Sequence, residues 1–233
     1  LVVPLLSFQI IEAVFRFSVE HRIKQQQNNI LSTSLLFTVF ISLFSIIFIP
    51  LLKYFDIFKE YNIYFYVLFF LTVIQGIVKQ YVRGLDKITH FVVIDILYTI
   101  IFAICNIFLL VVLNYGIKAY LISTAIALLS SGIYGFLAAQ LFRELYSFKI
   151  DFKLLQELLT YSVPLIPNGI MWWIINASDR YILSSYLGYN ATGIYSVAAR
   201  FPSLLTVVSS VFFQAWQLSA MEEYNSQNYK GDI

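Results

Sequence analysis

Charged residues are scarce in this chain. Lys, Arg, Asp and Glu make up 12% of its 233 residues, whereas 60% of the residues are hydrophobic. So few polar groups cannot coat the surface of a soluble domain of this size. The composition therefore excludes a soluble globular protein and makes a lipid bilayer the expected solvent. The net charge of +2 provides no general basic field, so we expect no nucleic-acid partner.

Cysteine and histidine are almost absent as well. A single cysteine, Cys105, can form neither an intramolecular disulfide nor a zinc site. The two histidines, His21 and His90, are far apart in the sequence and form no acid/base cluster. We therefore expect no catalytic residue, no metal and no cofactor, and the chain does not read as an enzyme.

Long apolar stretches take up most of the chain. A membrane-spanning helix needs about 20 mostly apolar residues, and such stretches predict an all-α, polytopic transmembrane helical bundle. The seven predicted spans are residues 1–18, 30–52, 61–82, 88–113, 117–142, 161–186 and 193–220. The chain starts with Leu1 inside an apolar run and stops shortly after the last span. We expect it to be a piece of a longer membrane protein.

Basic residues gather in alternate connections between the predicted spans. Such a bias marks the cytoplasmic side of a membrane protein, so the first, third and fifth connections should be cytoplasmic. The residues concerned are Arg16, Arg22 and Lys24, then Lys79, Arg83 and Lys87, then Arg143, Lys149 and Lys153. Glu12 and Arg16 are four residues apart and can pair along one helix.

Polar or small residues recur at helical spacing in several spans, which indicates either helix packing or a water-filled cavity. Ala127, Ser131, Gly135 and Ala139 predict a seam for close helix packing in the fifth span. For the third and fourth spans both interpretations stay open, because Lys79 and Asp95 are costly in lipid without partners. Asp95 is a candidate for ion coupling. The other stripes are Ser34, Thr38 and Ser42, then Thr72, Gln75, Lys79 and Arg83, then Asp95, Thr99, Ala103 and Asn106.

Residues 150–160 predict a short amphipathic helix on the cytoplasmic membrane surface. Asp151 can cap its start, and leucines at 154, 155, 158 and 159 form an apolar face. We expect this segment to link two bundles, residues 1–149 and 161–233.

The last two predicted spans carry the charges that are most unusual for a membrane anchor. Pro164 and Pro167 near the start of the first one predict a bend or hinge. A short turn should place Asp179 and Arg180 at the same depth as Arg200, about 10 Å below the outer surface. Asp179 then either forms a buried pair with Arg200 or Arg180, or belongs to a charged cavity lining. The polar residues on these faces are Asn168, Trp172, Asn176 and Asp179, then Arg200, Ser203, Ser210, Gln214 and Gln217.

Several motifs resemble the Wzx/RfbX-type oligosaccharide flippases of bacterial polysaccharide synthesis, in the multidrug/oligosaccharidyl-lipid/polysaccharide exporter superfamily. They are QIIEAVFRF at 9–17, YSVPLIPN at 161–168, WWIINASDRYIL at 172–183, LGYNATGIYSVA at 187–198 and FFQAWQLSAMEEY at 212–224. The resemblance implies part of a MATE-like, two-bundle transporter fold. Residues 1–149 would hold helices two to six, without the first helix, and residues 161–233 would hold helices seven and eight.

The resemblance also implies a function, which is the flipping of undecaprenyl-diphosphate-linked oligosaccharide across the bacterial inner membrane by alternating access. Arg200, Arg180, Asp179, Asn176, Gln214 and Gln217 would bind substrate, and Asp95 and Asp179 are the ion-coupling candidates. Membrane lipid and other polysaccharide-assembly membrane proteins would be further partners. The alternatives are a cation-coupled drug or solute exporter of the same superfamily, a membrane enzyme such as a polysaccharide polymerase or acyltransferase, and a structural membrane subunit.

Overall fold

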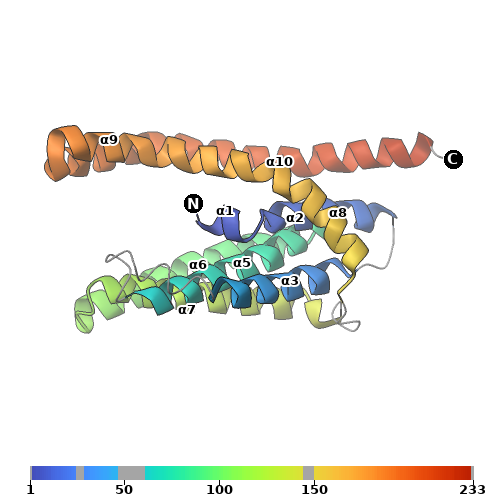
Figure 1. Ribbon diagram of the computed structural model, residues 1–233, viewed down its shortest axis with the longest axis horizontal. Coiled ribbons are helices and arrows are strands. Elements are labelled where there is room, and N and C mark those ends of the chain that lie inside the picture. Colours follow the sequence, from blue (N-terminus) through green and yellow to red (C-terminus); the bar gives the residue numbers. More distant parts are fainter. Residues whose placement is uncertain (1, 25–28, 47–60, 144–149, 232–233) are drawn as a thin grey trace. The chain divides into compact units, whose positions relative to one another are not determined.

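The computed structural model describes residues 2–24, 29–46, 61–143 and 150–231, and every regular element in these ranges is a helix. The chain divides into two compact units, which we call the N-terminal unit (Val2–Pro164) and the C-terminal unit (Leu165–Ile233). Figure 1 shows the helices of each unit. The N-terminal unit holds α1 (Val2–Leu6), α2 (Ile10–Lys24), α3 (Ile30–Ile46), α5 (Asn62–Gly84), α6 (Ile88–Ile107), α7 (Ile117–Ala138) and α8 (Phe152–Ser162); the C-terminal unit holds α9 (Ile166–Ala198) and α10 (Arg200–Gly231).

Four helical stretches in the described part of the chain are long and apolar enough to cross a membrane, which confirms the prediction of a polytopic helical bundle. They are Ile63–Gly84, Ile88–Val112, Ile117–Ala138 and Phe152–Ala198. The second of them continues from α6 through a π-helical turn, Phe108–Val112. Helix α3 is apolar but shorter, and residues 47–52 of its predicted span lie outside the described residues. The total of seven spans stays a prediction.

The first predicted span, residues 1–18, is wrong as a single helix. Helix α1 ends at Leu6 and α2 begins at Ile10, and between them Phe8 and Gln9 have positive φ angles of 52° and 54°. The Ser7 hydroxyl donates to the carbonyl of Val3 over 2.6 Å. A serine hydroxyl that binds the backbone in this way competes with regular helix hydrogen bonding. The break has no glycine or asparagine to mark it, so the apolar pattern alone could not reveal it.

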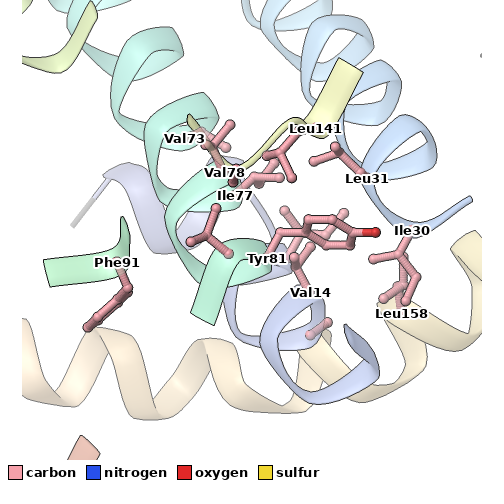
Figure 2. Packing of buried hydrophobic residues seen from close by; sticks show 14 of the residues in the cluster. Val14, Ile30, Leu31, Val73, Ile77, Val78, Tyr81, Phe91, Leu141 and Leu158 are labelled. Atoms are coloured by element: carbon pink, nitrogen blue, oxygen red, sulfur yellow. The ribbon is translucent and has the colours of Figure 1, made fainter. Parts of the chain in front are cut away.

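Helix α5 runs through the core of the N-terminal unit and packs against α2, α3, α6 and α7. Figure 2 shows Tyr81 of α5, which is 1% exposed, among apolar side chains from neighbouring helices. The neighbours include Val14 of α2, Leu31 of α3 and Leu158 of α8. Residues far apart in the sequence thus close one apolar core.

Small residues line α7 where it meets α5 and α6, as the sequence predicted. The seam is longer than expected, because Ala119 and Ser123 extend it at the same spacing of four residues, and both are 0% exposed. A Cβ atom added at Gly135 would lie 2.7 Å from Cδ1 of Ile94 on α6 and 3.0 Å from Cγ1 of Val78 on α5. Rows at this spacing incline across a helix surface, so a single seam can serve two neighbouring helices.

The described helix ends that flank the basic connections contact one another in the N-terminal unit. Lys87, which precedes α6, donates from Nζ to the carbonyl of Ala139 at the end of α7 over 2.6 Å. Gly84 at the end of α5 packs directly against Ser18 of α2. The structure therefore brings together helix ends that the positive-inside rule assigns to one side of the membrane.

The C-terminal unit is a hairpin of two helical arms. Gly188 interrupts α9 with φ 78° and ψ 178°, a conformation open to glycine and strained for other residues. The arms are residues 166–187 and residues 189–198 continued by α10 (Figure 1). The apex is a single residue, so 189–192, predicted as a loop, is helical.

Candidate functional site

Lys79 and Asp95 form an ion pair between two membrane helices of the N-terminal unit. The distance from Lys79 Nζ to Asp95 Oδ1 is 2.7 Å, and Lys79 Nζ also lies 5.0 Å from the centre of the Phe91 ring. Lys79 precedes the end of α5 by five residues and Asp95 follows the start of α6 by seven, so the two side chains lie at similar depth. Intramembrane charges commonly pair in this way, because an isolated charge in hydrocarbon is costly.

The Lys79–Asp95 pair is open on one side. The Asp95 side chain is 51% exposed and that of Lys79 is 25% exposed. Thr99 and Ala103, one and two turns further along α6, are exposed too, so packing within the unit does not cover this stripe. By contrast, Ser34 and Thr38 of α3 are 0% and 3% exposed. Their burial indicates a packing role for that stripe, and Thr38 satisfies its own hydroxyl within the helix by donating to the carbonyl of Ser34 over 2.8 Å.

Arg83 lies one helical turn beyond Lys79 and is 4% exposed. Its guanidinium carbon lies 4.0 Å from the centre of the Phe15 ring and 5.7 Å from that of Phe91. Cation–π contacts of this kind stabilise a charge that has left water. The opposite charge of Glu12 on α2 also attracts it. Arg83 is therefore a buried, paired charge that joins α2, α5 and α6.

The predicted pairing of Glu12 with Arg16 is corrected by this arrangement. The Arg16 guanidinium lies over the Tyr161 ring, 4.3 Å from its centre, while Glu12 interacts with Arg83. Both contacts join helices that are distant in the sequence. The spacing of four residues made the local pair plausible, but it carried no information on these tertiary partners.

Asp179 has a partner that the sequence did not suggest. The Tyr195 hydroxyl donates to Asp179 Oδ2 over 3.0 Å, from one arm of the hairpin to the other. Asp179 lies nine residues before Gly188 and Tyr195 seven residues after it, so the two are level. The expected pairs of Asp179 with Arg180 or Arg200 do not occur among the described contacts. Asp179, Arg180 and Arg200 are all exposed.

The predicted depths of the two arginines need correction. Because Gly188 is the apex, Arg180 lies eight residues before it and Arg200 twelve residues after it. At 1.5 Å per residue these positions are about 12 Å and about 18 Å along the arms from the turn. Arg200 is thus deeper than Arg180 and level with residue 176, not with Asp179. The difference arises because residues 189–192 add a helical turn that the sequence suggested was a loop.

The remaining predicted residues fall into three groups. Gln214 and Gln217 are half-buried on α10. The side chain of Asn176 lies outside the described residues. Pro164 falls in the short 3₁₀ turn Val163–Leu165 between α8 and α9, and Pro167 follows as the second residue of α9, where its missing N–H leaves no helical bond unmade. Among the residues that the structure describes, no three His, Cys, Asp or Glu side chains are grouped to hold a metal ion.

A profile of the Polysaccharide biosynthesis protein family matches residues 1–217. The chain belongs to this family. The match confirms the resemblance to Wzx-type flippases and extends from the N-terminal unit into most of the C-terminal unit. Family members are transporters, which fits a protein without an enzymatic reaction. No curated protein and no solved structure matches the chain.

With four long apolar helices in its described part, the chain is a multi-pass membrane protein of the polysaccharide biosynthesis (flippase) family. The family implies a lipid-linked oligosaccharide as substrate.

Proposed function

We propose that this polysaccharide biosynthesis protein flips undecaprenyl-diphosphate-linked oligosaccharide across the bacterial inner membrane by alternating access. The substrate joins a lipid tail to a doubly charged diphosphate and a hydrophilic glycan. Only the tail is compatible with hydrocarbon, so the other two parts need a polar route. The helices before and after the α8–α9 junction would belong to the two bundles that form this route.

The observation that carries the proposal is the exposure of Arg180 and Arg200 on a membrane hairpin. Both lie well below its apex, and Arg200, at about 18 Å, is deeper than half of a hydrocarbon core of about 30 Å. Charges at such depth face a bundle interior or a water-filled cavity in membrane proteins, because lipid would penalise them. A guanidinium can donate two parallel hydrogen bonds to phosphate oxygens. These arginines thus have the chemistry and the depth for a diphosphate.

Asp179 and Asp95 would take different parts in transport. Asp179, held by Tyr195, would orient sugar hydroxyls or the neighbouring arginine at the wall of the route, together with Asn176, Gln214 and Gln217. Asp95 is already neutralised by Lys79 at 2.7 Å. A proton or cation at Asp95 would release Lys79, which is the simplest way for this pair to couple ion movement to transport. The 3₁₀ turn with Pro164 would act as the pivot between the two bundles.

The test is complementation of a deletion strain, scored for surface polysaccharide and for lipid-linked oligosaccharide in the inner leaflet. With Arg200→Ala we expect at least about tenfold less surface polysaccharide, since losing a charge-assisted contact to bound substrate costs more than about 1.4 kcal/mol. Arg200→Lys, which retains charge without the planar fork, should be intermediate. Leu205→Ala, at a residue 73% exposed on the same helix, is the matched control.

Accumulation of substrate in the inner leaflet at normal protein levels would support flipping. Unchanged polysaccharide with Arg200→Ala would remove Arg200 from the proposal. Loss of long chains while single repeat units still reach the outer face would indicate a polymerase instead. Normal glycan with altered drug resistance would indicate the exporter alternative.

A further inference from the structure

Helix α8 has three different sides, although the sequence predicted one apolar face and one polar face. The expected apolar face consisted of Leu154, Leu155, Leu158 and Leu159. In the structure Leu154 and Leu158 are 7% and 0% exposed, whereas Leu155 and Leu159 remain half-exposed. The predicted face is therefore divided between a part that is covered by protein and a part that is not.

The first side of α8 is bound to the N-terminal unit. Leu154, Leu158 and Ser162 are buried where α8 packs on α2 and α3. The helix is also held near both ends: the N–H of Asp151 donates to Thr33 Oγ1 of α3 over 3.2 Å, and Tyr161 lies under the Arg16 guanidinium. Contacts at both ends prevent rotation of α8 about its own axis. The directions of its other two sides are thereby set.

The second side is apolar and only partly covered: Leu155 packs with its inner edge against the core, and the rest of this side is open. At 100° per residue, Leu155, Leu159 and Val163 follow one another along the helix in a sector next to the buried one, and Phe152 falls in the same sector. Phe152 is 76% exposed and Val163 is 42% exposed. A shallow groove runs along this side and is lined mainly by these residues. We call Phe152, Leu155, Leu159 and Val163 the apolar edge of α8.

The third side is polar. It carries Lys153, Gln156, Glu157 and Thr160, all exposed, in the sector opposite the first two. Asp151 caps the same helix and accepts hydrogen bonds from the N–H groups of Lys153 and Leu154. One side of α8 thus packs on protein, the second carries apolar side chains, and the third carries charged and polar side chains.

The position of α8 along the chain places it at the boundary of the hydrocarbon. From Ile166 to the apex at Gly188 the first arm of the hairpin spans 22 residues, or about 33 Å. This length matches a hydrocarbon core of about 30 Å. Only the 3₁₀ turn Val163–Leu165 separates α8 from that arm. Within the N-terminal unit, Asp151 donates to Thr33 near the start of α3 and Tyr161 lies under Arg16 of α2, so α8 is held near the end of the unit that carries the basic residues. This position puts the apolar edge near the depth where lipid headgroups give way to acyl chains.

We propose that the apolar edge of α8 is a lipid-contact surface, which inserts between acyl chains at the membrane interface while the polar side faces water. Helices of this kind bury their apolar side by about 5–10 Å at the boundary between headgroups and acyl chains. The apolar edge would hold the end of the N-terminal unit against the bilayer just before the chain enters the C-terminal unit. This role does not depend on which substrate is transported.

The test measures the surroundings of α8 directly, in the protein reconstituted into vesicles of phosphatidylethanolamine and phosphatidylglycerol. The only cysteine is first removed by Cys105→Ser, and nitroxide labels are attached to Phe152→Cys and Leu159→Cys on the edge. Lys153→Cys and Glu157→Cys on the polar side are the matched controls. Collision rates with oxygen, which concentrates in lipid, and with a water-soluble nickel chelate are then compared by electron paramagnetic resonance.

We expect the ratio of oxygen to nickel collisions to be several-fold higher at positions 152 and 159 than at 153 and 157. Equal ratios on the two sides would overturn the proposal, because the edge would then face water. Low collision rates with both reagents at 152 and 159 would also overturn it, because protein would then cover the edge. If Leu159→Cys disturbs packing, the strongly exposed Phe152 position still gives a decisive reading.

Discussion

The two units treat polar residues in opposite ways. In the N-terminal unit most of them have protein partners: Arg83 is buried near two aromatic rings, Lys79 is paired with the half-exposed Asp95, and the serines of α7 lie in a helix seam. In the C-terminal unit Asp179, Arg180 and Arg200 are exposed. A polar stripe on an apolar helix can thus be the inner side of a packed interface or an open surface.

The comparison shows that partners, more than residue type, decide what a membrane charge does. Arg83 and Arg200 are both arginines in apolar helices. Arg83 is 4% exposed and stacked on Phe15, so its contacts join helices of the unit. Arg200 is exposed, and its guanidinium can still receive a ligand. Only the second arrangement suits binding and release of a substrate.

The largest difference in stability between the two units is expected from glycine-to-alanine substitutions. A Cβ atom at Gly84 would overlap with Ser18 Cβ and lie 3.3 Å from the carbonyl oxygen of Phe15, and backbone cannot move aside easily. Gly84→Ala should therefore destabilise the protein by about 1–3 kcal/mol through overpacking. A Cβ at Gly193, in the open hairpin, would meet nothing within 4 Å. Gly193→Ala should be neutral or stabilising by up to about 1 kcal/mol.

Unfolding in detergent, followed by the loss of helical circular dichroism, measures both glycine variants. Equal stability of the two proteins would contradict the close approach of α2 and α5. A large loss of stability with Gly193→Ala would show that other helices pack tightly on the hairpin.

The second prediction concerns the Lys79–Asp95 pair. Lys79→Gln leaves a carboxylate without its partner, and Asp95→Asn leaves an ammonium without its partner. The double variant leaves neither, so it should lose less stability than the sum of the losses in the two single variants. The coupling energy from the double-mutant cycle should be about 0.5–2 kcal/mol, since the pair is partly exposed. Unfolding of the four proteins at one pH measures it. Strictly additive effects would mean that the 2.7 Å contact contributes nothing to stability.

Several features of the fold could be predicted because they depend on local pattern. The length of the apolar stretches predicted the membrane helices, and the spacing of the small residues predicted the α7 seam. Asp151 was correctly predicted as the N-cap of α8. Each of these depends on residues close together in the sequence. The break between α1 and α2 is local as well, but its residues, Ser7 to Gln9, include no glycine, proline or asparagine.

The charge partners could not be predicted in the same way, because they depend on which helices become neighbours. One rule does recover one of the charge partners: in two antiparallel helices joined by a short connection, residues equally far from the connection lie at the same depth. Applied to the connection after Gly84, it pairs Lys79 with Asp95. Applied to the hairpin with a loop at 187–192, it matched Asp179 with Arg200, because the true apex, Gly188, was not recognised. With that apex the same rule finds Tyr195.

The smallest expected effect on stability comes from the hydrogen bond between Tyr195 and Asp179. Tyr195→Phe removes the hydroxyl, but both residues are exposed, so water can replace the bond and the loss should stay below about 1 kcal/mol. Surface polysaccharide should fall more clearly, because Asp179 would lose its fixed orientation at the wall of the proposed route. Asp179→Asn, which keeps the shape and removes the charge, should lower transport further at similar stability. A loss of stability as large as that of Lys79→Gln would instead place Tyr195 in a packed interface, and the contrast between the two units would then no longer hold at this position.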